Sequence, residues 1–161
     1  MSDVCGVKPG DRAEFQKTVT TEDIQKFAEV TGDSNPLHSD PEYAKKTRFG
    51  ECIAHGMLSA GFISAVLGTK LAPNACAIYL SQTLRFLRPV KVGDAVCFYT
   101  DVKRVGQTSI TLDVEVWVLR HGCDQRIKVT RADFTFVAIG EDGRPRPIQL
   151  EPSPPGTTDQ N

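Results

Sequence analysis

The chain has 161 residues and a mass of 17.6 kDa, and its 19 basic and 20 acidic residues leave a net charge of −1. This length favours a single domain, and a hydrophobic content of 40% is that of a globular protein and not of a disordered chain. The balanced charge provides no basic surface for nucleic acid or an anionic membrane, and no apolar run is long enough to span a bilayer.

The cysteines and the N-terminal residues indicate the cellular compartment. The five cysteines are odd in number and scattered, at positions 5, 52, 76, 97 and 123, which favours neither a disulfide framework nor a zinc site. Residues 1–11 carry neither an apolar signal segment nor a run of arginines. We expect an intracellular protein, most simply a cytoplasmic one, although a single sequence does not separate the bacterial cytosol from an organelle.

The first periodic segment predicts a helix that begins after Thr20 and stops at Gly32. Thr20 is a good N-cap, with Asp23 three residues further on. A polar loop over residues 33–38 is expected next. The run Ser39-Asp40-Pro41-Glu42 then combines a capping box with an early proline and predicts a short second helix.

Residues 55–68, HGMLSAGFISAVLG, predict a third helix that is apolar almost all round. A helix of this kind is buried on every side, and its small residues let a sheet approach closely. We therefore expect this helix at the centre of the fold.

After this helix the hydrophobic period changes to two, which predicts strands over residues 77–86, 95–105, 110–118 and 126–137. The clearest alternation places one buried face on Ile110, Leu112, Val114, Val116 and Val118. A change of phase between Val129 and Ala132 predicts a bulge in the last strand. Helices early and hairpin-linked strands late predict an α+β fold with an antiparallel sheet wrapped around one helix.

The C-terminal tail is rich in proline and ends in PSPPGTTDQN. This composition predicts a disordered tail over residues 151–161 and one folded domain over residues 1–150.

Two residues of the polar loop, Asp33 and His38, could carry acid–base chemistry. Adding or removing water requires one group that takes a proton from water and another that delivers a proton to carbon. An imidazole, with an ordinary pKa near ~6.5, can do either near neutral pH. The same side chains could instead cap turns and lie on the surface, and their spacing does not decide between the two interpretations.

The start of the central helix, His55-Gly56-Met57, could stabilise negative charge. Helix N-termini have unpaired N–H groups at the positive end of the dipole, and glycine at position 56 would let a carbonyl approach the backbone. Packing alone would equally explain that glycine. We expect His55 to be structural, because a helix N-terminus disfavours its cationic form.

Other reactive motifs are incomplete. Ser59 lacks the first glycine of G-x-S-x-G, Cys52 has no feature of an activated thiolate, and P-loop, dinucleotide-binding and zincin motifs are missing. Several basic residues could meet a phosphate-bearing carrier or could be solvated surface charges: Lys45, Lys46, Arg48, Arg85 and Arg88.

The run from Phe27 to Asp40, FAEVTGDSNPLHSD, closely resembles the motif of the MaoC-like (R)-specific enoyl-CoA hydratases. The resemblance covers about residues 22–68 and includes Ala44, Phe49, Ile53 and His55-Gly56-Met57-Leu58. Weaker similarities extend it over most of the chain, at Lys8-Pro9-Gly10-Asp11, Phe86-Leu87-Arg88-Pro89-Val90 and Gly93-Asp94.

The resemblance implies a hotdog fold, in which an antiparallel sheet wraps a long central helix, and a homodimer with its two sheets side by side. It implies that Asp33 and His38 are the catalytic pair and that the N–H of Gly56 binds the thioester oxygen. It also implies that Ser64 lies near the site and that Asn35 holds the loop over residues 33–38 in shape.

The implied activity is that of a hydro-lyase. It would hydrate a trans-2-enoyl thioester to the (R)-3-hydroxyacyl thioester and catalyse the reverse dehydration, without a metal or redox cofactor. The thioester would be carried by coenzyme A or by an acyl carrier protein. Acyl chain length, the choice of carrier, the pathway and the division of proton transfers between Asp33 and His38 are not readable from the sequence.

Two alternative functions stay open. A hotdog thioesterase would hydrolyse the thioester, but it usually places a carboxylate on the central helix, which carries none between His55 and Gly68. A non-catalytic acyl-binding subunit would not require the intact pair of Asp33 and His38.

Overall fold

The computed structural model describes residues 9–71, 77–120, 122 and 125–148, so the predicted tail and three of the cysteines lie outside the described residues. In chain order the elements are β1 (Arg12–Thr18), α1 (Thr21–Thr31), α2 (Pro36–Ser39), α3 (Pro41–Lys45), α4 (Gly56–Val66), the π-helical turn η1 (Leu67–Leu71), β2 (Ala77–Phe86), β3 (Ala95–Val105), β4 (Ser109–Leu119) and β5 (Arg126–Ala138).

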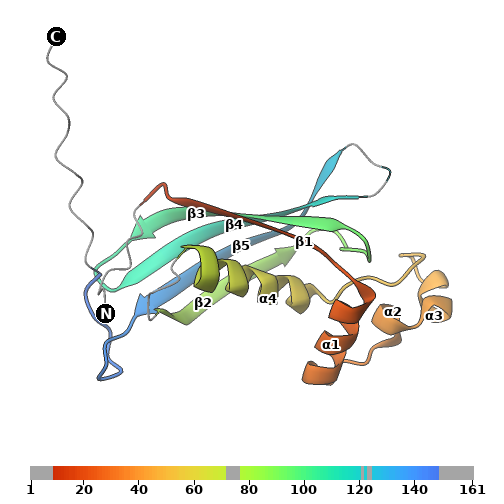
Figure 1. Ribbon diagram of the computed structural model, residues 1–161, viewed down its shortest axis with the longest axis horizontal. Coiled ribbons are helices and arrows are strands. Elements are labelled where there is room, and N and C mark those ends of the chain that lie inside the picture. The colour runs from red at the N-terminus through yellow and green to blue at the C-terminus, as the bar shows by residue number, and fades with distance from the viewer. Residues whose placement is uncertain (1–8, 72–76, 121, 123–124, 149–161) are drawn as a thin grey trace, which may run out of the picture.

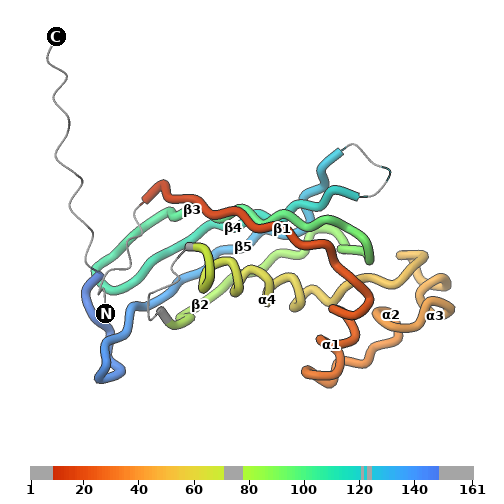
Figure 2. The backbone as a smooth tube through the Cα atoms, in the orientation of Figure 1, coloured from red at the N-terminus to blue at the C-terminus, as the bar shows by residue number. Residues whose placement is uncertain are grey.

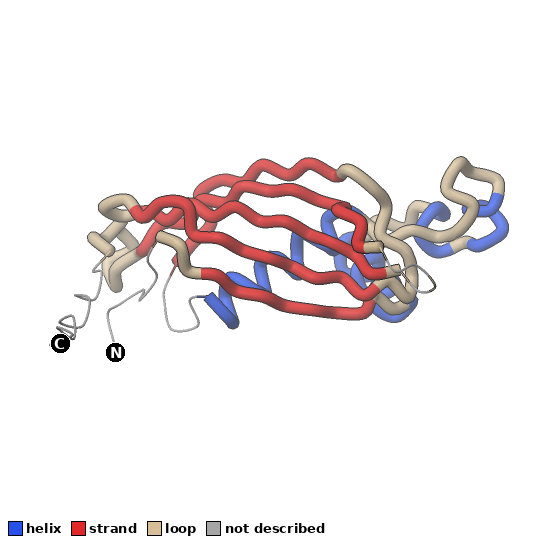
Figure 3. Tube along the Cα trace, turned by 90° about the horizontal axis from the view of Figure 1, so that it is seen from above, coloured by secondary structure: helices blue, strands red, loops and turns tan. Residues whose placement is uncertain are grey.

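The five strands form one antiparallel sheet in the order β1-β3-β4-β5-β2. Helix α4 lies along one face of this sheet (Figure 1), and the view from above shows the strands passing over it (Figure 3). The α+β prediction is therefore confirmed, and the four strands expected from the sequence match β2 to β5 within one residue at each end.

The core lies between the sheet and α4. All five residues predicted for the buried face of the 110–118 segment are buried, and the largest fully buried side chains are Phe98 of β3 and Phe134 of β5. Ile63 and Val66 of α4 belong to the same core cluster. The hydrophobic alternation thus decided which face of the sheet receives the helix.

The first helix is as predicted, whereas the region after it differs. In α1, the side chain of Thr20 accepts a hydrogen bond from the N–H of Asp23, and Gly32 ends the helix at a φ of 76°. The predicted loop over residues 33–38 is partly helical, because it contains α2, and α3 is capped by Asp40 instead of Ser39. Ser39 is the last residue of α2, and Asp40 is both the C-cap of α2 and the N-cap of α3.

The central helix begins one residue later than predicted and continues into η1. The prediction that it is buried on every side is wrong for the single chain. Met57 is 50% exposed, and Gly61 and Ala65, which follow it at intervals of four residues, are exposed on the same face. The physical reason is that the sheet covers one side of the helix and leaves the opposite side open.

The bulge expected in the last strand is confirmed. Val116 of β4 pairs with Thr130 and the next residue, Trp117, pairs with Lys128, so that Val129 is the extra residue of β5. A second register shift, which the sequence did not indicate, lies between Tyr79 and Ser81 of β2.

An ion pair fixes the segment between β2 and β3. The carboxylate of Asp94 is 2% exposed and accepts hydrogen bonds from Nε and Nη2 of Arg120 at 3.0 and 2.8 Å. Arg120 also donates to the carbonyl of Pro89 at 3.1 Å. Because breaking such a buried pair leaves an uncompensated charge, residues 89–94 are held firmly against the sheet.

Helices α1, α2 and α3 lie together beyond one end of the sheet, and the N-terminus of α4 points toward them (Figure 2). This placement brings the 33–38 region next to residues 55 and 56. Within the described part of the chain, none of the helices has the length and apolar character needed to cross a membrane.

Candidate active site

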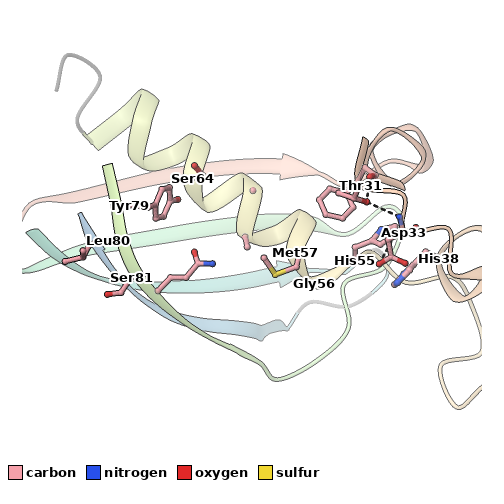
Figure 4. A pocket seen from close by; sticks show the side chains of 14 residues that line it. Thr31, Asp33, His38, His55, Gly56, Met57, Ser64, Tyr79, Leu80 and Ser81 are labelled. Carbon is pink, nitrogen blue, oxygen red and sulfur yellow. Dashed lines mark hydrogen bonds and ion pairs between the residues drawn. The ribbon is translucent and has the colours of Figure 1, made fainter. Parts of the chain in front are cut away.

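Three side chains meet where the N-terminus of α4 faces the α1–α2 connection: Asp33, His38 and His55 (Figure 4). Each contributes one oxygen or nitrogen atom, and these three atoms lie within 4.8 Å of one another. The structure therefore brings together the two residues that the sequence proposed as an acid–base pair and adds a third.

A backbone hydrogen bond orients the His38 ring. Its Nδ1 lies 2.7 Å from the carbonyl oxygen of Ile53. Because a carbonyl oxygen only accepts, Nδ1 carries the hydrogen, and Nε2 of the neutral ring keeps its lone pair. His38 is therefore prepared to take a proton through Nε2.

His55 is buried between the other two residues and α1. Its Nε2 lies 3.1 Å from the main-chain oxygen of Asp33, to which it donates, and 3.9 Å from the carboxylate oxygen Oδ2. Its ring stacks on that of His38 with 3.7 Å between centroids, and Phe27 packs on it at 4.9 Å. His55 therefore fixes the positions of both members of the pair relative to the start of α4.

Asp33 keeps its carboxylate accessible, since the side chain is 52% exposed. Its main-chain N–H donates to Oγ1 of Thr31 at 3.3 Å, as the dashed line in Figure 4 shows. The N–H of Asn35 donates to Oδ1 of Asp33 at 3.4 Å, and Oδ1 of Asn35 accepts from the N–H of Leu37 at 3.0 Å. Asn35 thus caps α2 and holds the turn that presents Asp33.

His55 and the Ile53 carbonyl that holds His38 lie on one short segment, residues 53–55, which is bound to residues 90 and 91. The N–H of Ala54 donates to the carbonyl of Val90 at 2.8 Å, and Ile53 forms a β-bridge with Lys91. The N–H of Ile53 reaches the carbonyl of Leu37 at 3.4 Å. The loop that carries Asp33 and His38 is therefore fixed indirectly to residues 89–94, which the ion pair of Asp94 holds in place.

Gly56 is the first residue of α4, so its N–H is among those without an acceptor inside the helix. A Cβ at this position would lie 3.0–3.2 Å from three atoms of the Phe86 ring. The expected open approach to the backbone is therefore partly occupied by Phe86, and glycine is required here for packing as well as for any oxyanion contact.

Two cavities share Gly56 and the two histidines as part of their walls. The large cavity, of about 770 Å³, extends along α4 and β2; the residues that line it are Phe27, Thr31, Asp33, His38, His55, Gly56, Met57, Ala60, Gly61, Ser64, Tyr79, Leu80, Ser81 and Gln82. The small cavity, of about 300 Å³, is lined by His38, Arg48, Phe49, Ile53, Ala54, His55, Gly56, Ser59, Phe86, Leu87, Arg88, Pro89, Val90 and Thr130.

Ser64 lies at the far end of the large cavity, eight residues and about 12 Å along the helix axis from Gly56. Tyr79 of β2 lies opposite it in Figure 4. Burial raises the pKa of the Tyr79 hydroxyl, although the Ser64 hydroxyl partly offsets this effect. The hydroxyl therefore stays protonated at neutral pH, and Ser64 lines the cavity without contacting the acid–base pair.

The contacts of His55 with both Asp33 and His38 were not predictable from the sequence. The position of His55 before a glycine at a helix start gave no indication of the ring stacking or of the bond to Asp33, because both partners lie about 20 residues earlier in the chain.

Cys52, in contrast, behaves as expected. Burial, and then the carboxylates of Asp40 and Glu51, raise the pKa of its thiol, so a thiolate nucleophile is disfavoured.

A carboxylate and two imidazoles are also a donor set that transition metals accept. Here Nε2 of His55 already donates a hydrogen to a backbone oxygen, and the imidazole planes stack at 28° instead of converging on one point. The arrangement favours proton transfer over metal binding.

Comparison with known proteins identifies relatives of this chain. The (R)-specific enoyl-CoA hydratase of Rhodospirillum rubrum is 52% identical over 90 residues, which are 56% of this chain and 62% of that protein. The chain thus matches less than two thirds of this relative's length. The acyl-CoA thioester hydrolase YciA of Salmonella typhimurium is 39% identical over 90 residues, 54% of this chain and 68% of that protein.

Among solved structures, the unliganded R-hydratase PhaJ1 of Pseudomonas aeruginosa superposes with a TM-score of 0.74 at 34% identity. The superposition covers 94% of this chain and 92% of that one, and it confirms the expected hotdog fold. Residues 6–132 match the family described as the MaoC like domain. By this match over most of its length, the chain belongs to the MaoC-like family.

Proposed function

We propose that this protein is a hydro-lyase that adds water to a trans-2-enoyl thioester and forms the (R)-3-hydroxyacyl thioester, and that it also catalyses the reverse reaction. The observation that carries the proposal is that a carboxylate oxygen of Asp33 and a ring nitrogen of His38 lie within 4.8 Å of each other beside the N-terminus of α4. The MaoC-like family and the hydratase relatives support the same activity. The reaction itself needs no metal or redox cofactor.

In the proposed mechanism, Asp33 and His38 orient a water molecule, remove one of its protons and supply a proton to C2 while oxygen bonds to C3. We treat them as one unit, because interacting acid–base groups share their titration. Electron density moves to the thioester oxygen as the C3–O bond forms, and the N–H of Gly56 donates to that oxygen at the positive end of the helix dipole.

The substrate in this proposal is a thioester of coenzyme A or of an acyl carrier protein. The large cavity accounts for the acyl group, since most of the surface that lines it is apolar and it begins at Asp33 and His38. Asn35 contributes by shaping the loop, and Ser64 contributes to the wall of this cavity.

Thioester hydrolysis is the second candidate, because the YciA relatives match this chain. Helix α4 carries no Asp or Glu, however, and the only carboxylate among the described residues of the large cavity is Asp33. A non-catalytic acyl-binding subunit would not require this arrangement of His38, His55 and Asp33, so the arrangement favours an enzyme.

Crotonyl-CoA tests these candidates. Hydration removes the enoyl-thioester absorbance without releasing thiol, whereas hydrolysis releases one thiol per substrate. Loss of absorbance with no free thiol is the expected result. Equal amounts of thiol and consumed substrate would identify a thioesterase, and no change in either signal would favour a binding subunit.

Asp33→Asn and His38→Ala are each expected to lower kcat for crotonyl-CoA by about 10²–10⁴-fold, the usual effect of removing a general acid–base group. The double variant should be little worse than the poorer single variant, because the two groups act together. Circular dichroism checks that the fold is intact. Full activity in either single variant would refute the assignment.

His55 is expected to act as a positioning residue. His55→Phe keeps a flat ring beside His38 but cannot donate to Asp33, whereas His55→Gln keeps a donor and loses the ring. We expect kcat to fall about ten- to a hundredfold in His55→Phe and less in His55→Gln, with little change in KM, because small misplacements are costly. If His55 is only structural, both variants will lower Tm and leave kcat near normal.

Gly56→Pro tests the oxyanion contact directly, because it removes the N–H at the first helical position, where proline is well tolerated. The preceding residue, His55, already has the extended φ of −60° and ψ of 135° that proline requires. Gly56→Ala is the matched control, since it adds the same Cβ against Phe86 and retains the N–H. We expect kcat about 10²–10³-fold lower for proline than for alanine; equal values would exclude the N–H contact.

A homodimer is also proposed, with the sheets joined at β2. The two edges of the sheet differ: β1 carries charged residues, whereas β2 exposes Ile78, Leu80 and Phe86, with Leu80 65% exposed. Charged edges resist pairing with another chain and apolar edges invite it. The exposed face of α4 around Met57 adds further apolar surface.

Sedimentation at micromolar concentration should therefore give the mass of two chains, and Leu80→Lys should shift the protein toward one chain by placing a charge on that edge. Glu14→Lys, on the β1 edge, is the control and should leave the mass unchanged. A wild-type mass of one chain, or dissociation by the β1 variant alone, would contradict the proposed interface.

A further inference from the structure

The two cavities that meet at Gly56 differ in electrostatic character. Among the described residues that line the large cavity, the only Asp, Glu, Lys or Arg is Asp33. The described lining of the small cavity includes Arg48 and Arg88 and no acidic residue. Walls of this kind would orient a molecule that has one apolar end and one anionic end.

We propose that the small cavity is the entrance for the pantetheine arm of the substrate, and that Arg48 and Arg88 bind the phosphate at the end of that arm. This assignment rests on the proposed function, since it takes the substrate to be an acyl thioester. The thioester then lies at Gly56, and the acyl chain continues into the large cavity toward Ser64.

The two arginines have the placement that such a phosphate requires. Both line the small cavity and both are exposed, which puts them at its mouth and not in its interior. The guanidinium of Arg48 lies 4.8 Å from the ring centroid of Phe49, another residue of this wall. Nη1 of Arg88 donates to the carbonyl of Lys128 at 3.3 Å, which uses one of the five donors of that group.

The length of the arm agrees with a phosphate at the mouth. An extended pantetheine spans on the order of 14 Å from sulfur to phosphorus, because an extended chain advances about 1.1–1.2 Å per bond. A cavity of about 300 Å³ holds little more than one extended arm of this length, so the phosphate at the end of the arm lies at the mouth of the cavity. There the planar guanidinium can contact two phosphate oxygens at once.

Coenzyme A and acyl carrier protein both present a phosphate on pantetheine, so three substrates separate the possible sources. Initial hydration rates are measured with crotonyl-CoA, crotonyl-4′-phosphopantetheine and crotonyl-pantetheine. The proteins compared are the wild type, Arg48→Gln, Arg88→Gln and the double variant. Arg85→Gln is the matched control, since Arg85 is an exposed arginine that lines neither cavity.

The wild type should prefer crotonyl-phosphopantetheine to crotonyl-pantetheine through a lower KM. Each arginine variant should raise the KM for the phosphorylated substrates about three- to tenfold, the range of exposed charge-assisted contacts, and the double variant should lose the preference. Added salt should weaken the preference of the wild type by screening. Arg85→Gln should retain it.

An unchanged preference in the double variant, or an equal loss in Arg85→Gln, would overturn the inference while the proposed function stands. A loss confined to crotonyl-CoA would overturn the assignment to the shared phosphate and assign the arginines to the nucleotide end of coenzyme A. If the wild type hydrates none of the three substrates, the proposed function itself fails.

Discussion

The arrangement of the site depends on the backbone of residues 53–55. This segment is bound on one side to Val90 and Lys91, and on the other side it supplies the carbonyl that holds His38 and the imidazole that holds the Asp33 backbone. One short extended stretch therefore transmits the rigidity of the sheet to a loop that has few buried contacts of its own. The ion pair between Asp94 and Arg120 contributes to this rigidity, because it fixes the segment that contains Val90 and Lys91, to which residues 53–55 are bonded.

The position of the helix follows from the one-sided sheet. Strands that alternate between buried and partly exposed residues leave one apolar face, and α4 is the element that covers it. Once the helix lies there, its N-terminus must face α1 and α2, and Gly56 comes to the junction of the two cavities. The site is thus built where a helix end, a sheet edge and a capped loop meet.

The chemistry of the site is set by hydrogen bonds to the backbone and not by contacts between charged side chains. His38 and His55 each donate to a carbonyl oxygen, which defines the tautomer of each ring and leaves the lone pair of the neutral His38 ring on Nε2. Asp33 stays half exposed beside them, where water can reach it. An arrangement of this kind suits repeated proton exchange with water, which hydration and dehydration both require.

The sequence by itself determined much of this protein. Hydrophobic alternation identified the buried face of the sheet, the phase change placed the bulge at Val129, and Thr20 with Gly32 bounded the first helix, because each of these features is a local consequence of backbone geometry. The run from Phe27 to Asp40 indicated the family, which the comparisons confirm, and the assignment of Asp33 and His38 as the catalytic pair stays a prediction. These inferences needed only neighbours within a few residues along the chain.

Only the tertiary structure decided the contacts between distant segments. The stacking of His55 on His38 joins residues 17 positions apart, and the Phe86 ring lies beside Gly56, 30 positions earlier in the chain. The two cavities that meet at that glycine are likewise lined by residues from distant segments. The open face of α4 also appeared only in three dimensions, because an apolar sequence shows that a surface avoids water and does not show which chain covers it. Long-range pairing is set by the packing of the whole fold, and no local pattern encodes it.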